Sequence, residues 1–206
     1  MQAVTERPIV LAITGASGAP YAVRVLRSLV EARRRTWLVV SSHGLRLLAT
    51  EMGIDSVDAL RASIGAEGWD HCVTTYTDGD RGAAPASGST RTAGMIICPC
   101  SMGTVAAIAH GTSRSLIERA ADVTLKERRR LVVVPRETPY SEIHLENMLR
   151  LTRAGGIVLP ASPGYYHRPT EVAHLVDFVA ARILDLFDVE HTLVRRWGGE
   201  PDALNE

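Results

Sequence analysis

The chain has 206 residues, of which 46% are hydrophobic and 22% charged, a length and composition typical of one globular domain. Lysine plus arginine and aspartate plus glutamate both total 23, so the chain lacks the net positive charge of many nucleic-acid-binding proteins. The three cysteines, Cys72, Cys98 and Cys100, have neither the number of a disulfide framework nor the spacing of a structural zinc site, and they fit a reducing compartment.

Short β-branched or aliphatic runs predict strands, and the segments between them have apolar residues at helical spacing. In chain order the predicted elements are a strand at 9–14, a helix at 21–31, a strand at 37–41, a helix at 44–52, a strand at 95–98, helices at 104–109 and 116–128, a strand at 131–134, a helix at 141–153, a strand at 157–159 and a helix at 171–186. Ser115, followed three residues later by Glu118, predicts a capping box at the start of the helix at 116–128.

The predicted strands are apolar along their length instead of alternating, which is the pattern of a parallel sheet covered on both faces. Strands that alternate with helices indicate right-handed βαβ crossovers. The sequence therefore predicts an α/β fold: a single-domain doubly wound, Rossmann-like (flavodoxin-like) parallel sheet with helices on both faces. We expect one domain over 1–206, with a core at 9–197 and a polar tail at 198–206. The Gly-rich stretch at 64–92 is interpreted as a long functional loop.

The start of the chain lacks the features of an export signal. Residues 1–8 contain Glu6 and Arg7 and have no apolar core. No apolar run approaches the roughly 18 residues that suggest a membrane span. We therefore expect a soluble, cytoplasmic protein without a membrane partner.

Small and hydroxyl-bearing residues follow the predicted strands, at the edge where open α/β sheets bind ligands. The stretches are Gly15-Ala16-Ser17-Gly18, Ser41-Ser42, Pro99-Cys100-Ser101-Met102-Gly103-Thr104, Pro135-Arg136-Glu137 and Pro160-Ala161-Ser162-Pro163-Gly164-Tyr165-Tyr166. Glycines admit a ligand close to the backbone, hydroxyls donate hydrogen bonds, and helix N-termini offer N–H groups to phosphate. A tight turn alone would explain residues 15–18, which lack the full dinucleotide fingerprint. Five such strand ends together predict a site for an anionic, nucleotide-like ligand.

Several charged residues have two interpretations. Arg119 and Lys126 lie seven residues apart on one predicted helix face, where both are able to address one anion. On spacing alone, a solvated face with an Asp122–Lys126 ion pair is the better explanation. Glu51 and Glu137 are by default surface carboxylates, although Glu137 directly follows a strand and has the better position for chemistry. The histidines show no ligand spacing, so we expect no metal site.

Several unusual strings also occur together and in order. They are Thr14-Gly15-Ala16-Ser17-Gly18-Ala19, Ala49-Thr50-Glu51, Pro85-Ala86-Ser87-Gly88-Ser89, Cys98-Pro99-Cys100-Ser101-Met102-Gly103-Thr104, Leu116-Ile117-Glu118-Arg119-Ala120-Ala121-Asp122-Val123, Leu125-Lys126-Glu127-Arg128-Arg129, Val134-Pro135-Arg136-Glu137, Ile143-His144-Leu145-Glu146-Asn147-Met148 and Pro163-Gly164-Tyr165-Tyr166-His167. Together they resemble the UbiX-type flavin prenyltransferases, over nearly the whole chain from about residue 9 to residue 197.

The resemblance implies two ligand sites. FMN would be held by Gly15, Ala16, Ser17, Ser41, Ser101, Met102, Gly103, Thr104 and Arg136. Dimethylallyl phosphate would be bound by Arg119, Lys126, Glu137, Tyr166 and Arg182. Because the family forms homododecamers with sites at subunit interfaces, the resemblance also implies that Arg119 comes from a neighbouring subunit.

The implied reaction joins the dimethylallyl group to N5 of reduced FMN and closes a fourth ring at C6, giving prenylated FMN for a separate UbiD-type decarboxylase. No stable complex with that decarboxylase is expected. No metal is needed, because fixed cations and hydrogen-bond donors are able to stabilise the leaving phosphate. Lys126 binds that phosphate and Glu137 protonates it. Ser17 positions Glu137 and the flavin edge, and Glu51 assists proton removal from C6, with Ser17 or the released phosphate as competing candidates.

Three alternatives accompany this interpretation. A flavin-dependent cysteine decarboxylase of the same fold typically has Pro-Ala-Ser-Ala-Asn-Thr where this chain lacks the Asn. A non-catalytic FMN carrier would not need Lys126, Glu137, Tyr166 and Arg182 together. An aromatic acid decarboxylase in its own right fits the sequence less well than a supplier of the cofactor. Some relatives carry Trp where this chain has Arg81, which leaves the preferred prenyl donor open.

Overall fold

The computed structural model describes residues 7–195 and contains a six-stranded parallel sheet in the order β3-β2-β1-β4-β5-β6. The strands are β1 (Ile9–Ile13), β2 (Thr36–Val40), β3 (Val73–Thr77), β4 (Gly94–Cys100), β5 (Arg130–Pro135) and β6 (Ile157–Val158). The helices are α1 (Ala19–Glu31), α2 (Ser42–Met52), α3 (Val57–Ile64), α4 (Ala66–Cys72), α5 (Met102–Ala109), α6 (Leu116–Lys126), α7 (Glu142–Arg153) and α8 (Val172–Asp185), with a short 3₁₀ helix η1 (Ala84–Ala86). The predicted polar tail at 198–206 lies outside the described residues.

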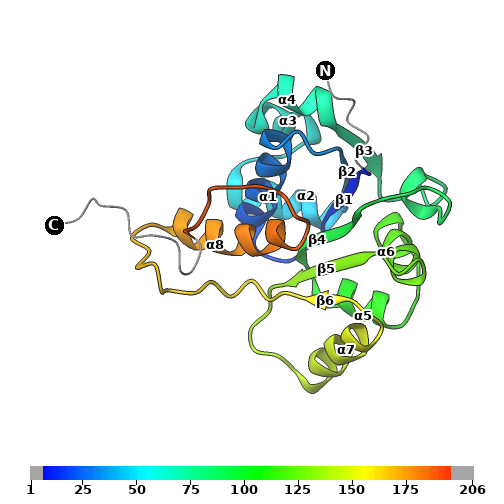
Figure 1. Ribbon diagram of the computed structural model, residues 1–206. Helices are drawn as coiled ribbons and strands as arrows, with labels where there is room; N and C mark the ends of the chain where they lie inside the picture. The colour runs from blue at the N-terminus through cyan, green and yellow to red at the C-terminus, as the bar shows by residue number, and fades with distance from the viewer. Residues whose placement is uncertain (1–6, 196–206) are drawn as a thin grey trace.

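Helices cover both faces of the sheet (Figure 1). One apolar core lies between the sheet and α1, α2, α3, α4 and α8, and the other lies between the sheet and α5, α6 and α7. Along β1, Leu11 and Ile13 belong to the first core, whereas Val10 and Ala12 belong to the second, as the two-residue period of a strand requires. The predicted doubly wound, Rossmann-like (flavodoxin-like) fold is confirmed, and every predicted strand and helix matches within two residues at each end.

The interpretation of residues 64–92 as a loop was wrong, because this stretch contains α4, β3 and η1. Strand β3 is one of the two edge strands of the sheet and, among the described residues, pairs only with β2. It is partly exposed along its length and rich in threonine, so it lacks the apolar run by which the buried strands were recognised. Helices α3 and α4 were also missed, since both are short and Gly65, with a φ of 117°, separates them.

The predicted capping box at α6 is only half formed. The Ser115 hydroxyl accepts a hydrogen bond from the Glu118 N–H at 3.3 Å, as expected. The Glu118 carboxylate, however, accepts from the Arg114 N–H at 2.7 Å instead of returning to Ser115. A complete reciprocal box is present at α7, where Ser141 and His144 bond each other's backbone N–H groups.

The chain reverses its direction across the sheet between β1 and β4, because β2 and β3 lie on one side of β1 and β4, β5 and β6 on the other. Connections that leave neighbouring strands in opposite directions open a crevice at the carboxyl ends of those strands. Thr14 ties the two ends together: its hydroxyl donates to the Pro99 carbonyl at 3.0 Å and accepts from the Ser101 N–H at 2.9 Å. The fold therefore fixes the floor of this crevice.

Within residues 7–195, no helix is long and apolar enough to cross a membrane. In the same range, no group of three or more His, Cys, Asp or Glu side chains lies close enough together to hold a metal ion.

Candidate active site

A cavity of about 230 Å³ lies at the carboxyl ends of β1, β2 and β4. Its lining residues are Thr14, Gly15, Ser41, Ser42, His43, Asp78, Ser101, Thr104, Ser115, Ile117 and Glu118. Four of them, Gly15, Ser41, Ser101 and Thr104, are among the predicted FMN ligands. The N-termini of α2, α5 and α6 meet around this cavity, so helix ends and hydroxyl groups dominate its wall.

The two predicted serines of the cavity are helix N-caps. Ser41 accepts a hydrogen bond from the Gly44 N–H of α2 at 3.0 Å, and Ser101 accepts from the Thr104 N–H of α5 at 3.2 Å. The Ser101 and Thr104 hydroxyls are also 2.9 Å apart. Because a hydroxyl accepts and donates at once, an N-cap serine still has a hydrogen to offer a ligand. The local turn chemistry and a ligand-binding role are therefore compatible at Ser41 and Ser101.

Close packing explains two glycines near Ser41. A Cβ on Gly15 would lie 2.5 Å from the Cβ of His43, and a Cβ on Gly44 would lie 2.4 Å from the Ile13 carbonyl oxygen. Real Cβ atoms do not approach so closely, so only glycine lets the start of α2 pack directly on the end of β1. Ala16, the next predicted FMN ligand, is 5% exposed.

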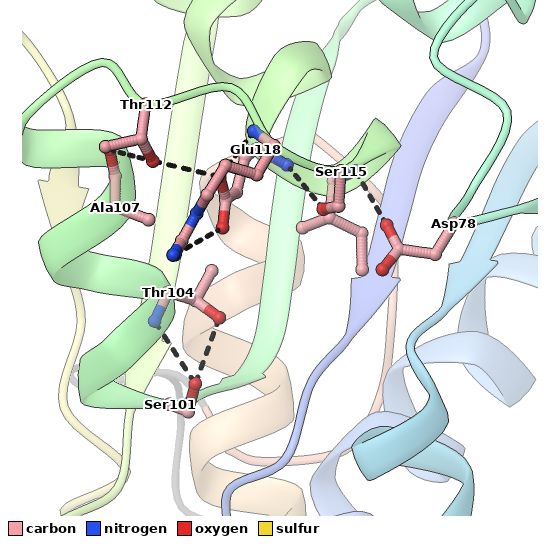
Figure 2. A network of polar contacts seen from close by, with 9 residues as sticks. Asp78, Ser101, Thr104, Ala107, Thr112, Ser115 and Glu118 are labelled. Atoms are coloured by element: carbon pink, nitrogen blue, oxygen red, sulfur yellow. Dashed lines mark hydrogen bonds and ion pairs between the residues drawn. The ribbon is translucent and has the colours of Figure 1, made fainter.

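Two of the helix N-termini at this edge are already neutralised by carboxylates. The Glu51 carboxylate accepts from the Gly18 and Ala19 N–H groups, at 2.9 and 2.8 Å, at the start of α1. At the start of α6, Asp78 accepts from the Leu116 N–H through its carbonyl at 2.7 Å and from the Ile117 N–H through its carboxylate at 3.0 Å. Figure 2 shows Asp78 pointing at this end of α6.

Around the cavity, an incoming anion therefore finds free backbone donors at the starts of α2 and α5. Among the described residues, no acceptor bonds the first two N–H groups of α5, Met102 and Gly103, or those of α2, Ser42 and His43. Such groups, with the positive end of the helix dipole, form an anion site. The geometry favours a phosphate at the starts of α2 and α5.

Ser17, Glu51 and Arg136 come together beside the cavity. The Arg136 guanidinium donates to the Ser17 carbonyl at 3.2 Å. Burial alone would raise the pKa of Glu51, but hydrogen bonds from the Gly18 N–H, the Ser17 hydroxyl and the Ala19 N–H, together with the Arg136 charge, hold it below its ordinary value. Glu51 is thus a stable anion that caps α1. Its predicted role in removing the C6 proton stays a prediction.

Glu137 and Tyr166 follow β5 and β6 at the same edge. Glu137 is half-buried and accepts from the Thr138 N–H at 3.1 Å. Residues 159–161 continue alongside β5, since the Leu159 N–H donates to the Val133 carbonyl at 2.9 Å and the Ala161 N–H to the Pro135 carbonyl at 3.1 Å. This pairing carries the segment with Tyr166, which is 77% exposed, past the end of β5.

Lys126 lies away from this edge in the same chain. It is in the last turn of α6, four residues before β5 begins at Arg130, and α6 carries it about 16 Å from Ser115 at 1.5 Å per residue. Its ammonium bonds Glu127 at 2.5 Å, while Arg119 pairs with Asp122 at 2.7 Å. The Asp122–Lys126 pair considered from the spacing is therefore replaced by these two pairs.

Arg182 also lies toward the amino end of the sheet. It is in the last turn of α8 and pairs with Asp185 at 3.1 Å. One turn further on, the Leu186 carbonyl accepts a hydrogen bond from Arg130, the first residue of β5. One chain thus does not bring Lys126 and Arg182 to the cavity, and their binding of one phosphate stays a prediction.

Sequence reasoning missed three carboxylate and hydroxyl residues of the cavity: Asp78, Ser115 and Glu118. Figure 2 shows them with their hydrogen bonds, including a 3.0 Å bond from the Thr112 hydroxyl to Glu118 that ties the loop after α5 to the start of α6. Asp78 directly follows β3, so recognising that edge strand would have placed it at the carboxyl edge with the others.

Comparisons with known proteins agree with this geometry. The model of the Flavoprotein family matches residues 2–197. The flavin prenyltransferase UbiX of Pseudomonas aeruginosa PAO1 is 46% identical over 196 residues, which cover 92% of this chain and 93% of the relative. The crystal structure of AnUbiX (PadA1) in complex with FMN and dimethylallyl pyrophosphate has a TM-score of 0.87 at 42% identity, covering 95% of this chain and all of that one.

A second solved structure is similar over nearly the same range. The dodecameric FMN-dependent Ubix-like decarboxylase from Escherichia coli O157:H7 has a TM-score of 0.85 at 42% identity and covers 93% of this chain and all of that one. The family model covers most of the chain, and these relatives are more than 40% identical to it over nine-tenths of its length. Both findings support the same family. The chain belongs to the UbiX family of flavin prenyltransferases.

Proposed function

We propose that this protein is a flavin prenyltransferase that transfers the dimethylallyl group of dimethylallyl phosphate to reduced FMN, at N5 and then C6. The observation that carries the proposal is the cavity at the β1–β4 crevice, where α2 and α5 leave backbone N–H groups free for a phosphate. The similarity to AnUbiX, whose structure is in complex with FMN and dimethylallyl pyrophosphate, supports FMN and a phosphorylated dimethylallyl donor.

The FMN phosphate would lie at the starts of α2 and α5, held by their backbone donors and by the hydroxyls of Ser41, Ser101 and Thr104. Gly15, Ala16, Ser17, Met102, Gly103 and Arg136 would complete the FMN site. Carboxylates at the starts of α1 and α6 repel a second anion there, so the remaining helix ends select the position of the phosphate.

Glu137 would act as the general acid that protonates the departing phosphate. Its half-buried carboxyl lies at the same sheet edge as Ser17, which supports the predicted role of Ser17 in positioning it. Arg119, Lys126, Tyr166 and Arg182 would bind the phosphate of the prenyl donor. Since Lys126 and Arg182 lie toward the amino end of their own sheet, they would come from neighbouring copies.

Assembly of several copies is therefore part of the proposal. The dodecameric relative from Escherichia coli supports a homododecamer with sites between subunits. The product, prenylated FMN, would serve a UbiD-type decarboxylase in the cytoplasm without a stable complex. That relative is named a decarboxylase, so the assay has to separate prenyl transfer from decarboxylation.

The test is a metal-free reaction. Purified protein is incubated without oxygen or divalent metal with chemically reduced FMN and dimethylallyl phosphate, and mass spectrometry follows FMN with one added five-carbon unit. We expect this product, and its absence under saturating substrates would refute the proposal. Glu137→Gln should retain FMN while losing most turnover, whereas Glu146→Gln, an exposed carboxylate on α7, should remain active. A fully active Glu137→Gln enzyme would remove the assigned role.

A further inference from the structure

Arg129 ties a loop to the end of α6. It lies between α6 and β5, and its side chain is only 16% exposed. One guanidinium nitrogen donates to the Thr90 carbonyl and the other to the Gly88 carbonyl, both at 2.7 Å. Hydrogen bonds from a charged donor are short and strong, and a planar guanidinium fixes two acceptors at once. Loop 87–90 is thus held by a residue distant from it in sequence.

The loop is held directly against Lys126. A Cβ on Gly88 would lie 2.8 Å from the Lys126 ammonium nitrogen and 2.5 Å from a carboxylate oxygen of Glu127. The same ammonium and carboxylate groups are 2.5 Å apart, and Glu127 is also 3.8 Å from Arg129. Only glycine fits at position 88 with the pair in this place. Lys126, Glu127, Arg129 and loop 87–90 therefore form one unit, which we name the Lys126 cluster.

The Lys126 cluster offers both charge and hydroxyl groups. Lys126 and Arg129 outweigh Glu127, so its formal charge is positive. The Ser87 and Ser89 hydroxyls of the loop are 2.9 Å apart, and the Thr90 N–H donates to the Ser87 carbonyl at 3.3 Å, closing a turn. A lysine on a flexible four-carbon stem loses entropy when it binds a phosphate. Contacts that restrain it beforehand reduce that loss.

We propose that Arg129 is a positioning residue, which holds loop 87–90 against Lys126 so that the ammonium and the serine hydroxyls form one prearranged surface for the phosphate of the prenyl donor. Arg129 itself bonds the loop carbonyls and does not contact the substrate. This inference rests on the proposed function. It extends the proposed function because it attributes the affinity for the prenyl phosphate, but not the affinity for FMN, to a contact between loop 87–90 and the end of α6.

The test compares two conservative substitutions at adjacent arginines. Arg129→Lys keeps the positive charge and loses the two-pronged geometry, while Arg128→Lys changes an exposed side chain next to it. With reduced FMN saturating and dimethylallyl phosphate varied, we expect the KM for the prenyl donor to rise about tenfold in Arg129→Lys, because the flexible Lys126 side chain is no longer restrained beforehand and loses more entropy on binding. The dissociation constant for FMN and the oligomer size should stay unchanged, and Arg128→Lys should match the wild type.

Two further measurements separate positioning from loss of folding. Hydrogen exchange at the amides of loop 87–90 should become faster in Arg129→Lys, but not elsewhere at the sheet. Gly88→Ala, which pushes the Lys126 and Glu127 groups apart and leaves Arg129 in place, should raise the same KM. The inference is overturned if Arg129→Lys leaves the KM within twofold of the wild type, or if FMN affinity falls in parallel. A wild-type protein that makes no prenylated FMN would instead refute the proposed function itself.

Discussion

If the phosphate ligands come from different copies, two inactive variants should restore activity when they assemble together. Lys126 precedes β5 at its amino end, and Glu137 follows it at the carboxyl end. The six residues of this strand span about 20 Å at 3.3 Å per residue. One chain therefore cannot present both side chains to one phosphate. Lys126→Ala and Glu137→Gln should each inactivate every site when expressed alone.

The composition of mixed assemblies sets how much activity should be restored. When the two variant chains are co-expressed in equal amounts and assemble at random, a site is whole only if its Glu137 comes from one type and its Lys126 from the other. The chance is one half times one half, so about a quarter of wild-type activity is expected for sites shared between subunits. The assay is formation of prenylated FMN by co-purified oligomers. Preformed oligomers of each variant, mixed without exchange, are the control, and mixed assemblies no more active than this control would refute the reasoning.

Two other substitutions test the helix ends. Glu51→Gln keeps an oxygen that is able to accept from the Gly18 and Ala19 N–H groups but removes the negative charge at the start of α1, worth about 1 kcal/mol, and should lower the melting temperature at pH 7 by about 2–4 °C. Because the folded-state pKa of Glu51 lies below its ordinary value of 4.5, this contribution is complete above pH 4.5 and is lost as the pH falls through the folded pKa. The difference in melting temperature between wild type and variant should therefore disappear in acid. A difference that stays constant with pH contradicts the role of the Glu51 charge at α1. Ser101→Ala should weaken FMN binding about tenfold in a fluorescence titration, as expected for a lost hydroxyl bond. Substitution of the exposed Thr50 by alanine should leave FMN binding unchanged. If Ser101→Ala binds FMN as tightly as the wild type, Ser101 is not part of the site.

The fold was predictable wherever burial dictates the residue type. Strands β1 and β4 are buried along their whole length, so an uninterrupted apolar run identifies each of them. The edge strand β3 has exposed positions and no uninterrupted apolar run, although its valine, threonines and tyrosine are all residue types that favour strands. Its pairing with β2 comes from the tertiary structure. No pattern within residues 73–77 specifies it.

The same distinction applies to the site. Ser41, Ser101 and Gly15 were recognisable because they immediately follow buried strands that the sequence identifies. Asp78 was missed, although it lines the same cavity, because the strand before it was missed. Glu51 was predicted as a site residue from the string that resembles the family, but its two backbone hydrogen bonds join residues about 30 positions apart. Contacts at such separations follow from packing and have no local signal.

The position of Lys126 shows what residue spacing leaves open. A separation of seven residues puts Arg119 and Lys126 on one helix face. The spacing does not show at which end of the sheet the last turn of that helix lies. In a βαβ unit the helix runs back across the sheet, so a side chain in its last turn lies opposite the ligand edge of its own chain. A lysine there is able to serve a strand-end site only in another copy. Under the proposed function, the cavity of one chain would suffice for FMN, whereas the cations proposed for the prenyl phosphate would depend on the assembly.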